Sequence, residues 1–129
     1  HIRLARKTRF MTDQELYHTL NTNPANTWKL NSGRIAIGKD AVLVIAKPKH
    51  GSASKDEFYS IDPQDILMVL HHGNISLFDE TVYSQLQNIN TDEYSKVYID
   101  GACKFVKGNL PQLIQKIKQF YPGANFPVN

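Results

Sequence analysis

The chain has 129 residues, 41% of them hydrophobic, which is enough for one core because a domain of this size buries roughly two thirds of its unfolded surface. Its net charge of +3, from 15 basic and 12 acidic residues, argues against a surface specialised for nucleic acid. No apolar stretch approaches the ~20 residues of a membrane helix, and the single Cys103 excludes an internal disulfide, so we expect a cytoplasmic protein.

Three helices are predicted at the N-terminal end. Residues 2–9 have the spacing of the last turns of a helix. Thr12 and Glu15 have the spacing of a capping box, and the N-cap alone contributes about 1 kcal/mol to helix stability. Asn23 followed by Pro24 predicts a further helix start with Asn23 as its N-cap, because proline is tolerated at the first helical position.

The chain is predicted to be organised around residues 32–48, where Gly33 and Gly38 precede the apolar run of residues 41–46. A run with three β-branched residues, bounded by glycine and proline, predicts a strand covered on both faces. We therefore expect the rest of the chain to pack around this strand. The polar residues 49–55 that follow are the best candidate for a mobile loop.

A first hairpin is predicted over residues 66–77, with its turn at residues 71–74. We expect the inner strand, residues 66–70, to be buried on both faces and the outer strand to be half buried. Asp79 is then predicted to cap a helix. Its apolar positions are Val82, Tyr83, Leu86 and Ile89.

A second hairpin is predicted over residues 96–107, and two registers are open. A two-residue turn at Asp100 and Gly101 would pair Ile99 with Ala102, whereas a three-residue connection would place all the apolar residues on one face. The single apolar face favours the longer connection. After it, Asn109 is predicted to cap an amphipathic C-terminal helix that ends at Pro122.

The histidines do not form a metal site in sequence. They are His1, His18, His50, His71 and His72. His71 and His72 are adjacent on a predicted strand, so their side chains should point to opposite faces and cannot share one ion. His18 has only Glu15 at helical spacing. Structural or solvent-exposed roles are therefore expected for all five.

Nucleophilic and phosphate-binding motifs are also missing. Ser52, Ser54 and Ser60 lack the surroundings of a catalytic serine, and Cys103 is expected to be a buried apolar residue. Residues 33–39 have the glycine and lysine spacing of a phosphate loop, but Asp40 follows and a strand comes next instead of a helix. Asp62 and Asp65 flank Pro63 and fit a turn better than an acid and base pair.

A cluster of four cations lies near the N-terminus. It consists of Arg3, Arg6, Lys7 and Arg9. On a helix these residues spread around much of the circumference, which predicts a solvated face more than a nucleic-acid surface.

The order of motifs resembles the C-terminal part of the metal-dependent amidohydrolase superfamily, in particular its imidazolonepropionase-like and cyclic-amidohydrolase branch. The motifs are TDQE at residues 12–15, NTNPA at 21–25, GRIAIGKDAVLVI at 33–45 and DILMV at 65–69. The resemblance extends from about residue 2 to residue 79. Val42 replaces the family's usual Asp, and Asn21 its frequent Thr, although neither position is a metal ligand.

The resemblance implies an α+β architecture. Residues 1–30 would be the last helices of a TIM-type barrel, and residues 31–129 would be the C-terminal part of a composite β-sandwich with a terminal helix. The family's metal ligands would all precede His1, so no catalytic, cofactor-binding or metal-binding residue is assigned here. A zinc-type divalent metal is implied only for the full-length enzyme, and the N-terminal remainder of that enzyme is the expected partner. We also expect a homo-oligomer, because unpaired strand edges favour association.

Two hypotheses follow. The chain is either a structural fragment of a C–N bond hydrolase that is inactive alone, or a small protein-interaction module without catalytic activity. A third and weaker idea is nucleic-acid binding through residues 3–9.

Overall fold

The computed structural model of the chain describes residues 1–51 and 54–128, and their fold is α+β as the sequence predicts. The helices are α1 (Ile2–Thr8), α2 (Asp13–Leu20), α3 (Thr22–Thr27), α4 (Lys55–Ser60) and α5 (Leu110–Phe120). The 3-10 helices are η1 (Pro63–Asp65), η2 (Glu80–Gln85) and η3 (Thr91–Glu93). The strands are β1 (Leu43–Ala46), β2 (Ile66–His71), β3 (Asn74–Asp79), β4 (Tyr94–Ile99) and β5 (Ala102–Lys107).

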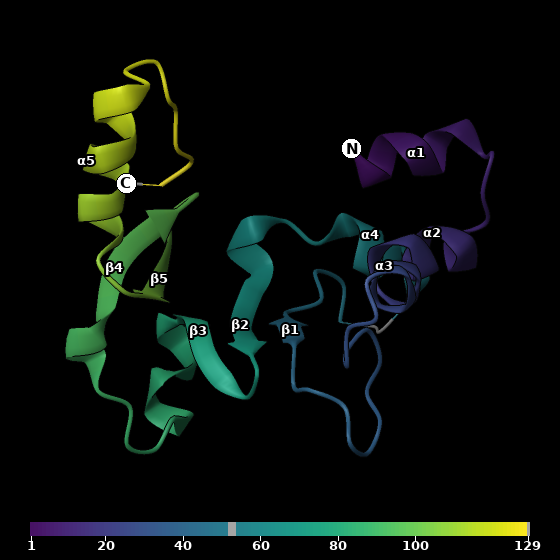
Figure 1. The fold of residues 1–129 in the computed structure, drawn as a ribbon, viewed down its shortest axis with the longest axis horizontal. Helices are drawn as coiled ribbons and strands as arrows, with labels where there is room; N and C mark the ends of the chain where they lie inside the picture. The colour runs from purple at the N-terminus through teal and green to yellow at the C-terminus, as the bar shows by residue number, and fades with distance from the viewer. Residues whose placement is uncertain (52–53, 129) are drawn as a thin grey trace.

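The elements form two lobes (Figure 1). Helices α1 to α4 gather at one end of the molecule, and β4, β5 and α5 lie at the other. The strands make one antiparallel sheet in the order β1-β2-β3-β5-β4. Strand β1 is therefore the edge of the sheet that faces the helical lobe.

The predicted capping box forms at the start of α2. Thr12 Oγ1 accepts a hydrogen bond from the Glu15 N–H at 3.2 Å, and the Glu15 carboxylate accepts one from the Thr12 N–H at 2.7 Å. The backbone hydrogen bond from Thr12 comes first among the causes that lower the pKa of Glu15. The predicted start of α3 is wrong by two residues, because α3 begins at Thr22 directly after α2 and Asn21 takes the N-cap position.

The core lies between β3, β4 and β5. Phe78 is fully buried, and its ring stacks on that of Phe105 with centroids 4.8 Å apart. Tyr83 of η2 stacks on both rings at 6.1 Å, and so covers this face of the sheet. Asp79 caps the segment that carries Tyr83, as predicted, but that segment is the 3-10 helix η2 and does not reach Ile89. The short helix suffices to bring Tyr83 over Phe78.

The prediction that residues 41–46 form the fully covered central strand is wrong. Only residues 43–46 are extended, and they lie at an edge, where Val44 remains 65% exposed and Ile45 45%. Strand β2 is the inner strand beside it, but its five consecutive apolar residues are only partly buried on both faces. The described part of the chain therefore supplies no complete cover for this half of the sheet.

Both hairpins use two-residue turns. His72 and Gly73 have φ of 48° and 76°, and Asp100 and Gly101 have φ of 46° and 83°, which is the pair of positive values that a type I′ turn requires. Ile99 pairs with Ala102, so the three-residue connection predicted for the second hairpin is wrong. The single apolar face assumed for that prediction does not exist, because Val97 pairs with Lys104 and both side chains are buried.

Candidate functional site

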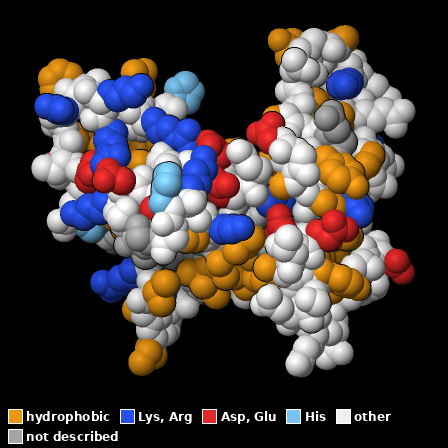
Figure 2. Space-filling view, turned by 180° about the vertical axis from the view of Figure 1, so that it is seen from behind, with side chains coloured by type: hydrophobic (Ala, Val, Ile, Leu, Met, Phe, Trp, Pro, Cys, Tyr) orange, Lys and Arg blue, Asp and Glu red, His pale blue; other side chains and the backbone are white. Residues whose placement is uncertain are grey.

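An apolar groove of about 440 Å³ lies at the junction of the two lobes. Apolar side chains from five elements line most of it. They are Ile2 of α1, Leu20 of α2, Val44 and Ala46 of β1, Phe58 and Tyr59 of α4, and Ile66 of β2, together with Ile61. Figure 2 shows hydrophobic side chains gathered in a band between the lobes. Val44 and Ala46 of the edge strand β1 are among the lining residues of the groove, and within the described residues no strand other than β2 pairs with β1.

The exposed surface of the whole chain is unusually large. Its accessible area is 9723 Å², whereas a compact monomer of this mass exposes about 6,900 Å². The surplus is about 2,800 Å², and many large apolar side chains contribute to it. A chain that leaves this much surface exposed has apolar area available for contact with other polypeptide.

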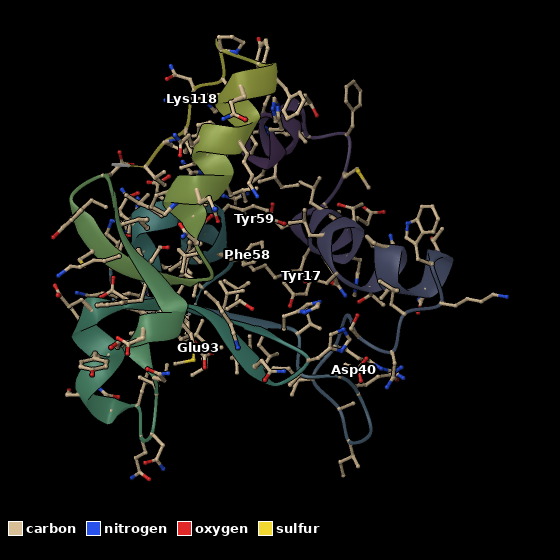
Figure 3. The ribbon with its side chains drawn as sticks, turned by 60° about the vertical axis from the view of Figure 1, so that its left-hand side comes forward. Tyr17, Asp40, Phe58, Tyr59, Glu93 and Lys118 are labelled. Carbon is tan, nitrogen blue, oxygen red and sulfur yellow. The ribbon has the colours of Figure 1, made fainter. Side chains whose placement is uncertain are left out.

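A second hollow, of about 350 Å³, lies between α2 and α4 next to the groove. Tyr17, Phe58 and Tyr59 come together there, as Figure 3 shows. The rings meet edge to face, with centroids 5.2 Å apart for Tyr17 and Phe58 and 5.0 Å apart for Phe58 and Tyr59. Tyr59 also donates a hydrogen bond to the carbonyl of Asp13 at 2.7 Å, which ties α4 to α2.

Helix α4 is the functional element that the sequence analysis missed. The sequence analysis predicts no helix after the loop of residues 49–55, yet Ser54 accepts a hydrogen bond from the Glu57 N–H at 3.2 Å and caps a helix that carries Phe58 and Tyr59. The signal was present, because Ser54 and Glu57 have the Ser-x-x-Glu spacing of a helix start. Helix α4 has six residues, which is too short for its apolar side chains to show a helical periodicity.

Arg3 fixes the wall of the groove. Its guanidinium donates to the carbonyls of Tyr59, Ser60 and Ile61 at 2.7 to 3.0 Å and to the Asp62 carboxylate at 2.6 Å. Lys49 reaches the other oxygen of Asp62 at 2.5 Å. These bonds lower the pKa of Asp62, with Lys49 contributing most and Arg3 next. Arg3 therefore holds the end of α4 at the position where the chain enters β2.

Arg6 joins α1 to both α2 and α4. It donates to the two oxygens of Asp13 at 2.8 and 2.7 Å, and it also contacts Asp56. These hydrogen bonds raise the pKa of Arg6, with Asp13 contributing most, and the bond from Arg6 lowers the pKa of Asp13. The predicted solvated face holds for Arg3, which is exposed although it pairs with Asp62, whereas Arg6 is partly buried beside Asp13. That pairing also weakens the idea of nucleic-acid binding through residues 3–9.

Glu57 ends the loop that begins at Lys49. Its buried carboxylate accepts hydrogen bonds from the N–H groups of Lys49 at 2.8 Å and His50 at 2.7 Å, and it contacts His50 Nδ1 at 2.5 Å. Burial raises the pKa of Glu57, but the hydrogen bonds from Lys49 and His50 outweigh it and the net pKa is lowered. Residues 49 and 50 of the predicted mobile loop are thus anchored, whereas Ser52 and Ala53 lie outside the described residues.

The histidines do not converge on a metal position. Among residues 1–51 and 54–128 no three His, Cys, Asp or Glu side chains are placed to hold an ion. His71 and His72 do not point to opposite faces as predicted, because His72 lies in the turn and the two rings are 4.3 Å apart. His72 Nδ1 lies 3.5 Å from Asp40 Oδ2. His50 contacts Glu57, and His18 Nδ1 lies 3.3 Å from Thr22 Oγ1.

The other candidate residues have structural positions. Ser54 caps α4, Ser60 donates to the Glu57 carbonyl, and Cys103 is buried, while Ser52 lies outside the described residues. Asp62 and Asp65 flank η1, where the Asp65 carboxylate accepts from the Asp62 N–H at 2.8 Å. Gly33 has a φ of 85°, and a Cβ there would lie 2.5 Å from that of Ala25, so this glycine permits close packing on α3.

A buried ion pair stabilises the other half of the sheet. Lys104 is 0% exposed, and its ammonium donates to Asp79 at 2.5 Å and to the carbonyls of Gln64 and Ile66 at 2.8 and 2.6 Å. Burial raises the pKa of Asp79, but the hydrogen bonds from Lys104 and Thr81 outweigh it, and the net pKa lies below the ordinary value. Lys104 links β5 to β3 and to the start of β2, and its partners explain why a lysine is tolerated inside.

No family model matches the chain, and no significantly similar curated protein or solved structure was found. The resemblance to amidohydrolases therefore depends on the sequence motifs alone. In the described part of the chain, no helix is long and apolar enough to span a membrane.

Proposed function

We propose that this chain is the C-terminal structural part of a metal-dependent amidohydrolase, a hydrolase of C–N bonds in non-peptide or cyclic amides, and that it is inactive alone. The observation that carries the proposal is the apolar groove beside the free edge of β1. The groove lies within residues 2–79, over which the family resemblance extends, and between the helices assigned to the barrel and the strands assigned to the sandwich. Three of its lining residues, Asn21, Val44 and Ile66, belong to the family motifs. Polypeptide from the rest of the enzyme would cover it.

The docking mode follows from the geometry of β1. A strand at a sheet edge presents unpaired N–H and C=O groups, to which an added strand can pair. Val44 and Ala46 of β1 line the groove, so a strand added there would also gain apolar contacts. Val44 belongs to the motif of residues 33–45, so the family resemblance covers the edge strand itself.

The implied divalent metal does not fit the described residues, because they provide no cluster of three ligands. We therefore assign zinc-type chemistry to residues outside this chain and no catalytic step to residues within it. The lone, buried Cys103 is consistent with the cytoplasm as the proposed compartment.

The test compares the 129-residue chain with the longest product of its gene by hydrogen exchange. We expect the amides of β1 to exchange quickly in the isolated chain and to be protected in the longer protein, which should also bind a divalent metal and hydrolyse amides. Val44→Lys should impair assembly of the longer protein. Ile35→Lys is the matched control, because Ile35 is exposed and lies outside the groove.

Two outcomes would contradict the proposal. One is a reading frame that begins immediately before His1, which would instead support the interaction module. The other is an isolated chain that holds a stoichiometric metal and hydrolyses amides by itself.

A further inference from the structure

The hollow of about 350 Å³ between α2 and α4 plays no part in the proposed function. Its volume lies within the range of pockets that bind small molecules, about 300–1,000 Å³. Tyr17, Phe58 and Tyr59 supply its apolar lining, and an aromatic lining with a few polar groups is typical of such pockets. The groove beside β1 shares Phe58 and Tyr59 but does not include Tyr17. The α2 wall of the hollow therefore needs an explanation of its own.

The three rings present a surface that suits a flat ligand. Tyr17 is 45% exposed and Phe58 37%, whereas Tyr59 is buried. Figure 3 shows the three side chains converging from α2 and α4. The hydrogen bond from the Tyr59 hydroxyl to the Asp13 carbonyl fixes the deepest of the rings. An aromatic ligand can pack against the exposed rings of Tyr17 and Phe58 in the offset or edge-to-face geometry that aromatic pairs prefer.

The features that would attract a cation are already occupied. The Arg6 guanidinium lies 4.7 Å from the centroid of the Tyr59 ring, which is the position of a cation–π contact. Arg6 also donates to both carboxylate oxygens of Asp13. Asp13 is the only carboxylate among the described residues that line the hollow. A cationic ligand would therefore have to displace Arg6.

The polar groups that remain at the mouth of the hollow are donors. The Lys55 ammonium takes part in no ion pair among the described residues. Gln14 is exposed, and Ser54 Oγ accepts a hydrogen bond from the backbone of α4, so its hydroxyl can still donate. Arg6 and Lys55 together carry one more charge than Asp13 neutralises. The mouth is thus complementary to an anion.

We propose that the hollow between α2 and α4 binds a small aromatic carboxylate, with the ring of the ligand against Tyr17 and Phe58 and its carboxylate at Lys55. The aromatic lining selects the ring, and the unpaired ammonium selects the negative charge. A carboxylate has two acceptor oxygens, so one can accept from Lys55 while the other accepts from Ser54 or Gln14. The proposal does not depend on the amidohydrolase assignment, because every group that it uses belongs to this chain.

The experiment is an NMR titration of the 129-residue chain with benzoate and with benzamide, which has the same ring and no charge. At low sodium chloride benzoate should bind about 5-fold more tightly than benzamide, which is the value of one solvent-exposed ion pair. Salt screens such a pair, so the preference should shrink at high sodium chloride. Cyclohexanecarboxylate, an anion without an aromatic ring, should bind more weakly than benzoate. Benzylammonium should bind no better than benzamide.

Two variants separate the charge from the ring, and each has a matched control. Lys55→Gln should abolish the preference for benzoate over benzamide. Lys7→Gln removes the same charge from an exposed residue of the same lobe that does not line the hollow, and should preserve the preference. Tyr17→Ala should weaken the binding of both probes by about 5-fold. Tyr121→Ala, at a ring that is 66% exposed after α5, should leave both unchanged.

All four substituted side chains are exposed, so the variants should fold, and circular dichroism checks that they do. The absence of saturable binding of benzoate would overturn the proposal, and so would equal affinities for benzoate and benzamide. An equal loss of preference in Lys7→Gln would also overturn it, because the charge of the whole lobe would then be responsible. Val44→Lys should leave benzoate binding unchanged, whereas a loss there would place the ligand in the groove beside β1 instead.

Discussion

The two regions of the sheet differ in how far their apolar side chains are covered. On the middle strand β3 Phe78 is 0% exposed, whereas on the edge strand β1 Val44 is 65% exposed. Strands β3 and β5 are covered by η2 on one face, and on the other Lys104 is fully enclosed among its hydrogen-bond partners. The described residues supply no such cover for β1 and β2. An apolar run therefore predicts a strand whose side chains need cover, but it does not identify the polypeptide that provides this cover.

The largest effect is expected at the core. Phe78→Ala should lower the free energy of unfolding by about 3–5 kcal/mol, because it removes a fully buried aromatic ring. Urea unfolding followed by far-UV circular dichroism measures the change. Phe10→Ala, at a ring that is 91% exposed, is the control and should change stability by less than about 0.5 kcal/mol. If the two substitutions lowered the free energy of unfolding by the same amount, Phe78 would not be more tightly packed than Phe10.

The buried ion pair should be the next most sensitive point. Asp79→Ala is expected to cost about 3 kcal/mol in the same unfolding experiment, because it leaves the Lys104 ammonium buried without its carboxylate. Glu80→Ala breaks the exposed pair with Lys96 and should cost at most about 1 kcal/mol. A small effect at Asp79 would show that the pair contributes little to the closed half of the sheet.

Low pH should destabilise the region of β3 and β5 through protonation of Asp79. Its pKa is lower in the folded chain than the ordinary 3.8, so the carboxylate contributes stability above that value and loses it as the pH falls toward the folded pKa. Stability measured by urea unfolding from about pH 6 to about pH 3 should fall at the acid end. Asp79→Asn should fall less steeply over the same range. Parallel curves for the two proteins would exclude Asp79 as a source of the acid sensitivity.

A smaller loss of stability is expected from a substitution in the turn of the second hairpin. Gly101→Ala should cost about 1–2 kcal/mol, because the type I′ turn holds this residue at a φ of 83°. Gly123→Ala is the control, since Gly123 is not among the glycines with positive φ and a Cβ there would meet Tyr121 only at ordinary contact distance. A tolerated alanine at Gly101 would contradict the positive φ that the two-residue turn gives this residue.

The smallest effect on stability is expected at the open edge. Val44→Lys should change the unfolding free energy of the isolated chain by less than about 0.5 kcal/mol, because the side chain is exposed. A loss of several kcal/mol, measured in the same way, would mean that β1 is covered within this chain. The proposed function requires both results, namely a small effect of Val44→Lys on the isolated chain and impaired assembly of the longer protein.

Local signals predicted much of the fold. The capping box of Thr12 and Glu15, the first hairpin turn at Gly73 and the Asn109 cap of α5 all form as expected. Each depends on residues close together in sequence, whose hydrogen bonds need no distant partner. The groove could not be predicted in the same way, since its lining residues come from five separate elements and one of them, α4, is too short for a periodic pattern.

The sequence by itself determined where most helices and strands begin and end within a few residues, α4 excepted, because caps, turns and apolar runs act over short distances. Only the tertiary structure decided which strand is enclosed and which register the second hairpin adopts. The physical reason is Lys104. Its charge is tolerated on a buried face only because the fold brings Asp79 and two backbone carbonyls, all distant in sequence, around its ammonium.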